Sequence, residues 1–388
     1  MAALNTARAL LIGIVAMAAA CAVAEQADTD NWTISRGNRA LHGQAAGELA
    51  DAMRLNWTFK ANESIRSSAA IDRGRVFVGC DNGYVYALEL GTGKELWRFI
   101  TGDAVEASPC VVDDTVYVGS ADYFLYALNV ADGKLIWKYE TGERILGGAN
   151  WVNAADGKGV RIIVGSYDSL LHCIDARSGR MVWTYDTANY INGTPAVDGD
   201  RIVFGGCDAL VHVVSASTGR RIGAVSAGSY IAGSVAVDGD LAFLGHMSNQ
   251  LLGVNLKRQA VIWESEDYRM PFFSSPAIDK TRMIVGGRDR KLHCVSRADG
   301  KSLWTFTARG KIDSSPVICG DKVVFGADDG RLYMVRLADG AMVWSYQVGD
   351  SITTTPAIAE GMVVISSEDG VVSAFAPAPA EPPAKKAE

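Results

Sequence analysis

A tryptophan recurs at intervals of about forty residues along most of this chain, and a repeat of that length is typical of solenoids and propellers. Gly223 lies midway between Trp183 and Trp263, where the interval doubles. The chain therefore has eight equivalent positions, one of which has lost its tryptophan. The seven tryptophans that follow this spacing, out of nine in the chain, are Trp57, Trp97, Trp137, Trp183, Trp263, Trp304 and Trp344.

The second repeat contains four short strand-like segments, residues 108–112, 115–119, 124–128 and 135–139, rich in β-branched and aromatic residues. Gly133 lies in the turn before the fourth segment, because a tight hairpin needs a residue that tolerates positive φ. The fifth repeat departs from this pattern, with Gln259 in place of the glycine. Since one four-stranded antiparallel sheet cannot bury both faces, the pattern predicts an all-β, eight-bladed propeller.

The two ends of the repeat region predict how the ring closes. The last repeat, residues 351–375, contains three strands and no tryptophan strand, whereas residues 55–59 form a tryptophan strand without a repeat of its own. We expect the N-terminal strand to complete the last blade, which joins the ends without leaving a long unpaired edge.

The chain divides into four parts: a signal peptide over 1–24, an N-terminal extension over 25–49, the propeller over 50–376 and a disordered, Pro/Ala-rich tail over 377–388. Residues 9–20 are apolar but too few to span a bilayer, and Ala22-Val23-Ala24 offers a cleavage site. Cys21 follows three alanines, as in a bacterial lipoprotein signal, so a lipid on Cys21 is the alternative to simple secretion. We expect a monomer.

Charge and motif content exclude several classes of function. The formal net charge of −7 argues against a nucleic-acid partner, which would require a basic stripe. The sequence contains no zinc-ligand spacing, nucleophile elbow or phosphate loop.

The cysteines and histidines fit structural roles better than metal binding. Cys173 and Cys294 occupy the same place in distant repeats and are predicted to be small buried residues, while Cys80 and Cys110, in neighbouring blades, are left as a candidate disulfide. Three histidines occupy a third-strand position that holds tyrosine in other repeats, so we expect them to pack between blades rather than converge on one ion. They are His172, His212 and His293.

The channel mouth is the best candidate for a ligand site. Counting three residues back from the proline position of each repeat gives one ring of residues, half of them charged or amide side chains. Glu106, Asn192 and Asp313 are suited to a hard cation or a polar ligand, whereas Arg66 beside Glu106 equally suits an ordinary ion pair. The ring consists of Arg66, Glu106, Leu146, Asn192, Ala232, Phe273, Asp313 and Thr353.

The repeats resemble the pyrroloquinoline quinone (PQQ) type of propeller repeat over nearly all of residues 55–375. The resemblance lies in segments such as 116–120 (Val-Tyr-Val-Gly-Ser) and 132–137 (Asp-Gly-Lys-Leu-Ile-Trp). Residues 32–38, with Trp32, Arg36 and Gly37, also resemble the Trp-x-x-x-Arg-Gly motif that precedes exported propellers of this type.

This resemblance implies one of two classes: quinone-dependent alcohol or sugar dehydrogenases, or cofactor-free envelope proteins similar to BamB of the β-barrel assembly machinery. In the enzymes the quinone stacks on a tryptophan and on a disulfide between adjacent cysteines, beside a calcium ion held partly by Glu and Asn, with a catalytic Asp nearby. The sequence has no adjacent cysteines, no Cys-x-x-Cys-His haem motif and no long insertions over the channel. A fold alone does not license a chemistry.

We therefore interpret the chain as a non-catalytic, exported interaction platform without catalytic residues or a cofactor, located in the periplasm or at the periplasmic face of the outer membrane. Its expected partners are envelope proteins, including the outer-membrane assembly machinery, and its only membrane attachment would be a lipid on Cys21. Residues 266–272 combine aromatic and charged side chains, which suits an interface, although Phe272 and Phe273 could instead plug the channel. The alternative is a divergent PQQ- and calcium-dependent dehydrogenase or a small-ligand or sugar-binding propeller.

Overall fold

The computed structural model describes residues 30–266 and 268–379, and all the regular secondary structure in these ranges is β-strand. Within them there is no helix that is long and apolar enough to cross a membrane. The expected signal peptide with Ala22-Val23-Ala24, Cys21, and residues 380–388 of the expected tail lie outside the described residues.

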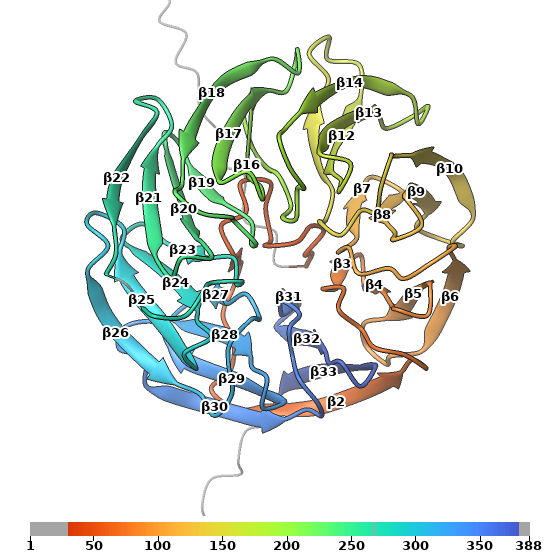
Figure 1. Cartoon of the computed structure of the whole chain (residues 1–388). Helices are drawn as coiled ribbons and strands as arrows, with labels where there is room; N and C mark the ends of the chain where they lie inside the picture. The colour runs from red at the N-terminus through yellow and green to blue at the C-terminus, as the bar shows by residue number, and fades with distance from the viewer. Residues whose placement is uncertain (1–29, 267, 380–388) are drawn as a thin grey trace, which may run out of the picture.

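Eight four-stranded antiparallel blades stand around a central axis, as the sequence predicted (Figure 1). Within each blade the first strand lies nearest the axis, where the first strands of neighbouring blades contact one another. Blades 1 and 2 are β3 (Ala70–Asp72), β4 (Arg75–Gly79), β5 (Tyr84–Glu89), β6 (Glu95–Ile100), and β7 (Cys110–Val112), β8 (Thr115–Gly119), β9 (Phe124–Asn129), β10 (Leu135–Glu140). Blades 3 and 4 are β11 (Asn150–Asn153), β12 (Val160–Gly165), β13 (Leu170–Asp175), β14 (Met181–Asp186), and β15 (Ala196–Asp198), β16 (Arg201–Gly205), β17 (Leu210–Ser215), β18 (Arg221–Ser226).

The remaining blades repeat this order. Blades 5 and 6 are β19 (Ala236–Asp238), β20 (Leu241–Gly245), β21 (Leu251–Asn255), β22 (Ala260–Glu264), and β23 (Ala277–Ile278), β24 (Arg282–Gly286), β25 (Lys291–Ser296), β26 (Ser302–Thr307). Blades 7 and 8 are β27 (Val317–Cys319), β28 (Lys322–Gly326), β29 (Arg331–Arg336), β30 (Met342–Gln347), and β31 (Ala357–Ala359), β32 (Met362–Ser366), β33 (Val371–Pro377), β2 (Met53–Lys60).

Blade 8 closes the ring with strands from both ends of the chain, which confirms the predicted closure. β2 pairs antiparallel with β33, with register running from Met53 opposite Pro377 to Lys60 opposite Val371. The amide of Ala378 donates a hydrogen bond of 2.9 Å to the carbonyl of Ala52. The last strand therefore extends past residue 376, beyond the point at which the sequence placed the start of the tail.

The strand order places two kinds of connection on opposite faces of the ring. The turns between second and third strands, and the connections from each blade to the next, lie on one face, which we call the ring face. The turns between first and second strands, and between third and fourth strands, lie on the other. This follows because consecutive strands of each blade run antiparallel.

Most neighbouring blades interlock through a tryptophan and a glycine. Trp97 in the outer strand of blade 1 donates its indole N–H to the carbonyl of Val130 in blade 2, at 2.9 Å. A Cβ on Gly133, where φ is +69°, would lie 2.6 Å from Trp97 Cε3, so only glycine fits beneath this ring. The same contact joins Trp57 to Gly93, Trp137 to Gly179, Trp183 to Gly219, Trp263 to Gly300 and Trp304 to Gly340.

The two irregular repeats turn out to be one compensating pair. Gly223 pairs with Val213 in blade 4, just as Trp183 pairs with Cys173 in blade 3. Gly223 therefore stands at the tryptophan position of its blade. A Cβ on Gly223 would lie 2.7 Å from the side-chain Cδ of Gln259. Gln259 therefore occupies space that an indole fills in the other blades, and the missing tryptophan and the missing glycine are partners across one interface.

The N-terminal extension runs along the inner strands on the side of the ring opposite the ring face (Figure 1, red). We call residues 32–49 the strap. Trp32, at the start of the strap, forms an antiparallel β-bridge with Ile71 of blade 1. Near its other end, β1 (Gln44–Ala45) pairs parallel with β27 of blade 7. Between these ends, strap carbonyls accept hydrogen bonds from inner-strand amides of blades 2, 4, 5, 6 and 7: those of Val111, Val197, Val237, Ile278 and Ile318.

Arg36 lies inside the strap and is 1% exposed. Its Nη2 donates to the carbonyl of Pro276 at 2.9 Å, while Nε and Nη1 are buried and have no hydrogen-bond partner in the described part of the chain. Burial lowers the pKa of Arg36 to about 9, which leaves the side chain charged at neutral pH. A Cβ on Gly43 would lie 2.1 Å from Nη2, so the strap itself encloses this guanidinium.

Candidate functional site

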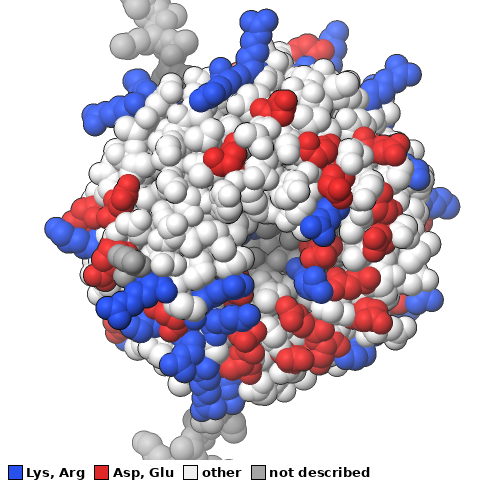
Figure 2. All heavy atoms as spheres, in the orientation of Figure 1, with Lys and Arg blue, Asp and Glu red and all other residues white. Residues whose placement is uncertain are grey.

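The predicted ring residues occupy equivalent places on the connections between blades, on the ring face, where Figure 2 shows a central hollow. All eight are exposed or half-buried. The eight residues thus have equivalent positions along their connections. Their side chains, however, form separate partnerships around the mouth instead of meeting at one point.

Arg66 joins blades 1 and 2 through two carboxylates. Its guanidinium lies 3.1 Å from Asp81 and 3.3 Å from Glu106. Burial opposes the charged form of Arg66, but these two carboxylates outweigh it and raise the pKa of Arg66. Burial also raises the pKa of Asp81, against the effect of Arg66, and the nearby charges of Glu106, Glu368 and Glu63 raise it further.

Asp313 has its own cationic partner. Arg288 binds it with two parallel contacts of 2.9 Å, and the ammonium group of Lys311 lies 3.7 Å from the same carboxylate. The guanidinium of Arg288 also lies 3.5 Å from the ring centroid of Phe273, in a cation–π contact. Phe273 is therefore held at the rim by blade 6, whereas Phe272 is 1% exposed and packs in the core.

Asn192 and Thr353 complete the polar part of the ring. Asn192 donates to the sulfur of Cys207 at 3.0 Å, and Thr353 contacts Glu368 at 3.3 Å. Glu106, Asn192 and Asp313, the cation candidates, are thus each engaged with a different neighbour. Among residues 30–266 and 268–379, no group of three His, Cys, Asp or Glu side chains is placed to hold a metal ion.

The partners of the ring are residues that the sequence reasoning missed. Asp81, Arg288 and Glu368 all lie in turns between the second and third strands of their blades. The backbone amides of Asp81 and Glu368 bond to the connection entering their blade, at the carbonyls of Ser64 and Ser351. Their fixed place after the second strand of each repeat was the signal that could have identified them.

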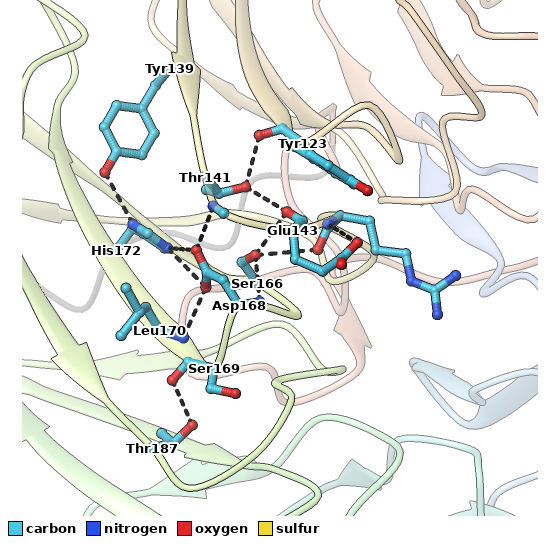
Figure 3. A network of polar contacts seen from close by, with 12 residues as sticks. Tyr123, Tyr139, Thr141, Glu143, Ser166, Asp168, Ser169, Leu170, His172 and Thr187 are labelled. Carbon is cyan, nitrogen blue, oxygen red and sulfur yellow. Dashed lines mark hydrogen bonds and ion pairs between the residues drawn. The ribbon is translucent and has the colours of Figure 1, made fainter.

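His172 ties two neighbouring blades together, as predicted (Figure 3). Tyr139 of blade 2 and His172 of blade 3 are 3.1 Å apart, from the tyrosine Oη to Nδ1. The other ring nitrogen lies 3.0 Å from Asp168, which also accepts the amide of Gly142 at 2.8 Å. Although burial opposes it, hydrogen bonding from His172 and Gly142 lowers the pKa of Asp168.

The same arrangement recurs in the next blade. Tyr185 contacts His212 Nδ1 at 3.0 Å, and His212 Nε2 lies 2.7 Å from Asp208. Burial lowers the pKa of His212 despite the neighbouring carboxylate, so the neutral imidazole predominates at neutral pH. His293 pairs with Asp289 at 3.1 Å in its own blade. These histidines are structural links.

The cysteines are free thiols in the described part of the chain. The disulfide left open between Cys80 and Cys110 is not formed, and both residues are buried in separate clusters. Cys173 and Cys294 are buried as predicted, and burial raises the pKa of both thiols to about 12. Neither thiol is therefore reactive at neutral pH.

The ring face divides into regions of different charge (Figure 2). Acidic side chains gather to the right of and below the central hollow, over blades 1, 2 and 8, and an uncharged area extends to the upper left, over blades 4 and 5. We call the first region the acidic sector; its loops (61–69, 80–83, 101–109, 120–123, 348–356 and 367–370) carry one cation, Arg66, and Lys60 at the end of β2 contacts Asp369. We call the second the aromatic sector; its loops (187–195, 206–209, 227–235 and 246–250) contain one charged residue, Asp208, whose side chain is 4% exposed. The acidic sector comprises Glu63, Asp81, Asp103, Glu106, Asp122, Asp350, Glu368 and Asp369.

The fold is similar to that of a BamB protein and of two alcohol dehydrogenases. BamB from Moraxella catarrhalis matches with 19% identity and a TM-score of 0.70, over 84% of this chain and 98% of that one. A europium-containing methanol dehydrogenase matches with 12% identity and a TM-score of 0.74, over 90% and 98%. The quinohemoprotein alcohol dehydrogenase from Comamonas testosteroni matches with 13% identity and a TM-score of 0.75, over 91% and 81%. At these identities the likeness shows the fold alone.

Family comparison is more specific. The family described as outer membrane protein assembly factor BamB matches residues 45–160, 149–276 and 327–381. No curated protein sequence matches significantly. Because the matched segments span more than half of its length, this chain belongs to the BamB family of PQQ-like propeller proteins.

Proposed function

We propose that this protein is a non-catalytic interaction platform of the bacterial envelope that contacts a protein partner through its ring face. Family membership supports the setting: the family's description names outer-membrane protein assembly, so that machinery is the proposed partner. The proposed location is the periplasm or the periplasmic face of the outer membrane.

The observation that carries this proposal is the pairing of the ring carboxylates. Glu106 is engaged with Arg66, and Asp313 is held by two contacts from Arg288. A general base or a calcium ligand needs a free carboxylate within reach of the reacting group or the ion. Charged pairs on a rim instead suit the orientation of a protein partner.

The side chains at the mouth do not fit a bound quinone. The described tryptophans lie in the strap, in outer strands or in β11, where Trp151 packs under Arg39 of the strap, at 4.3 Å. None is therefore available at the ring face to stack on the cofactor. Adjacent cysteines are missing from the sequence, and the Glu–Asn pair suggested for calcium, Glu106 and Asn192, is divided between separate partners.

The enzyme alternative is tested by reconstitution. The full-length chain is incubated with PQQ and calcium, and dye reduction is followed with primary alcohols and aldose sugars. Because loss of a positioned base typically costs about 100-fold to 10,000-fold in rate, we expect only background reduction. Alcohol-dependent dye reduction that Glu106→Gln or Asp313→Asn abolishes would establish the enzyme and overturn the platform.

The platform itself is tested by crosslinking in cells. A photoreactive amino acid replaces Tyr230 on the ring face, and Asp156, in the turn between β11 and β12 on the opposite face, is the matched control. We expect one reproducible adduct with an envelope protein from position 230 and none from position 156. Equal adducts from both positions, or none from the ring face, would contradict the proposal.

A further inference from the structure

We infer that the ring face binds a polypeptide segment with Lys or Arg side chains at one end, over the acidic sector, and apolar side chains at the other, against Tyr190 and Tyr230. This inference rests on the proposed function and adds the chemistry of the partner. The segment would cross the channel mouth between the two sectors, which lie on opposite sides of the central hollow (Figure 2).

The aromatic sector presents a rigid anchor. Tyr167 and Tyr190 are stacked, with centroids 4.7 Å apart and planes 3° from parallel. Arg144 covers Tyr167, with its guanidinium carbon 4.5 Å from the ring centroid. Tyr190 is nevertheless 48% exposed, and Tyr230, at the equivalent position of the next blade, is 55% exposed. Rings that are already ordered lose little entropy when a partner packs on them.

The surroundings of these tyrosines make the sector easy to dehydrate. Asp208, the only charged residue in the loops that define the sector, has a buried side chain that is paired with His212, and Arg144 at the sector's edge already packs on Tyr167. Burying an unpaired charge is costly, but a partner can cover this part of the face without dehydrating an unpaired charged group. The cores of protein interfaces are likewise depleted of charge and enriched in tyrosine.

The acidic sector offers the complementary feature. A cavity of about 500 Å³ opens there between the loops of blades 1 and 2, and Glu63, Asp81 and Asp103 are among its lining residues. Glu63 and Asp103 are exposed, and Asp81 Oδ1 is buried without a hydrogen-bond partner among the described residues. Arg66 already pairs with the other oxygen of Asp81, so an added ammonium or guanidinium group would supply a donor to Asp81 Oδ1 and positive charge to the exposed Glu63 and Asp103.

Charge also favours a polypeptide over a glycan. Stacked aromatic rings alone would suit a sugar as well as a peptide. A neutral sugar, however, carries no cation for the acidic sector, and an acidic glycan would be repelled by it. The two sectors together therefore match a chain that carries both kinds of side chain.

Fluorescence anisotropy of labelled peptides tests the inference with the full-length protein. The probe carries a run of lysines followed by tryptophans and leucines; a second peptide replaces lysine with glutamate, and a third replaces the apolar residues with serine. We expect only the first to bind, with affinity that falls as salt rises from about 0.02 M to about 0.3 M because screening weakens exposed charge pairs. A chitin oligosaccharide serves as the glycan competitor.

Variants assign the two ends of the probe. Tyr230→Ala should weaken binding by about tenfold, in the range of interface hot spots. Glu63→Gln with Asp103→Asn should weaken binding and also reduce its salt dependence. Ile222→Ala on an outer strand and Asp156→Asn on the opposite face are matched controls, which should bind the probe as the unaltered protein does.

The outcomes separate this inference from the platform proposal. The inference is overturned if the lysine peptide does not bind or binds no better than the glutamate peptide. It is also overturned if both ring-face variants keep the affinity of the unaltered protein, or if the oligosaccharide displaces the probe. If a ring-face crosslink to an envelope protein persists in that case, the platform stands and only the partner chemistry is wrong. If the crosslink is also absent, both proposals fail.

Discussion

Restoring the regular interface between blades 4 and 5 tests the interlock of tryptophan and glycine directly. Gly223→Trp alone places an indole where Gln259 already lies, because even a Cβ at residue 223 would come 2.7 Å from Gln259 Cδ. Overpacking of this kind costs about 1–3 kcal/mol. Gln259→Gly alone leaves unfilled space but relieves a φ of +52° at a non-glycine residue, worth about 1 kcal/mol.

The double variant should recover what both single variants lose. In the other blades the indole N–H donates to the carbonyl three residues before the turn glycine, as Trp97 does to Val130, and Leu256 occupies that position in blade 5. We expect the double variant to be at least as stable as the unaltered protein, with a coupling energy of about 2 kcal/mol. With an unfolding entropy of about 2.1 cal/mol/K per residue over about 350 residues, this corresponds to a difference of about 3 °C in Tm.

Thermal unfolding followed by circular dichroism at one scan rate measures all four proteins. Gly199→Ala is the control for a backbone change alone, since φ there is +59° and a Cβ would meet nothing within 4 Å. If the double variant melts no higher than Gly223→Trp, the two positions are not coupled and the compensating pair is refuted.

Four further predictions concern closure, acid stability, the strap and export. Deleting residues 50–60 removes β2, so Tm should fall and size-exclusion chromatography should show aggregates; an unchanged monomer would contradict the closure. Burial lowers the pKa of His212 below its ordinary 6.5, so the unfolded chain takes up the proton at a higher pH than the folded protein does. The stability that neutral His212 provides is therefore complete above about pH 6.5 and is lost as the pH falls. His212→Phe should reduce the change in Tm between about pH 7 and pH 5, and an unchanged slope would refute this. Arg36→Met should leave Tm equal or higher, because it removes a buried charge whose Nε and Nη1 groups have no described partner. Arg36→Ala is measured beside it, and an equally large fall in Tm for both variants would show that the charge itself is stabilising. Cys21→Ser should leave the cellular location unchanged if the chain is simply secreted, and a diacylated Cys21 in mass spectrometry would show a lipoprotein instead.

Patterns along the chain were enough to predict the number of blades, the strands within each and the closing role of residues 55–59. These features depend on local alternation, turn residues and the spacing of tryptophans, all of which repeat along the chain. The place of the ring residues was predictable for the same reason, since equivalent positions in repeats occupy equivalent places in the fold. The packing of His172 and His212 between blades also followed from their position in the repeat.

Which of these residues contact one another depends on the assembled fold. Gly223 and Gln259 are separated along the chain, and their contact depends on how the turn of one blade lies over the outer strand of another. Arg66 bonds to Asp81, and Asp313 to Arg288, because the turn between second and third strands reaches the mouth beside the ring, which no count along one repeat reveals. The course of the strap could not be predicted from the sequence either, because its residues belong to no repeat. The strap bonds mainly through backbone groups, and the closed ring, rather than the side chains of residues 32–49, sets their partners.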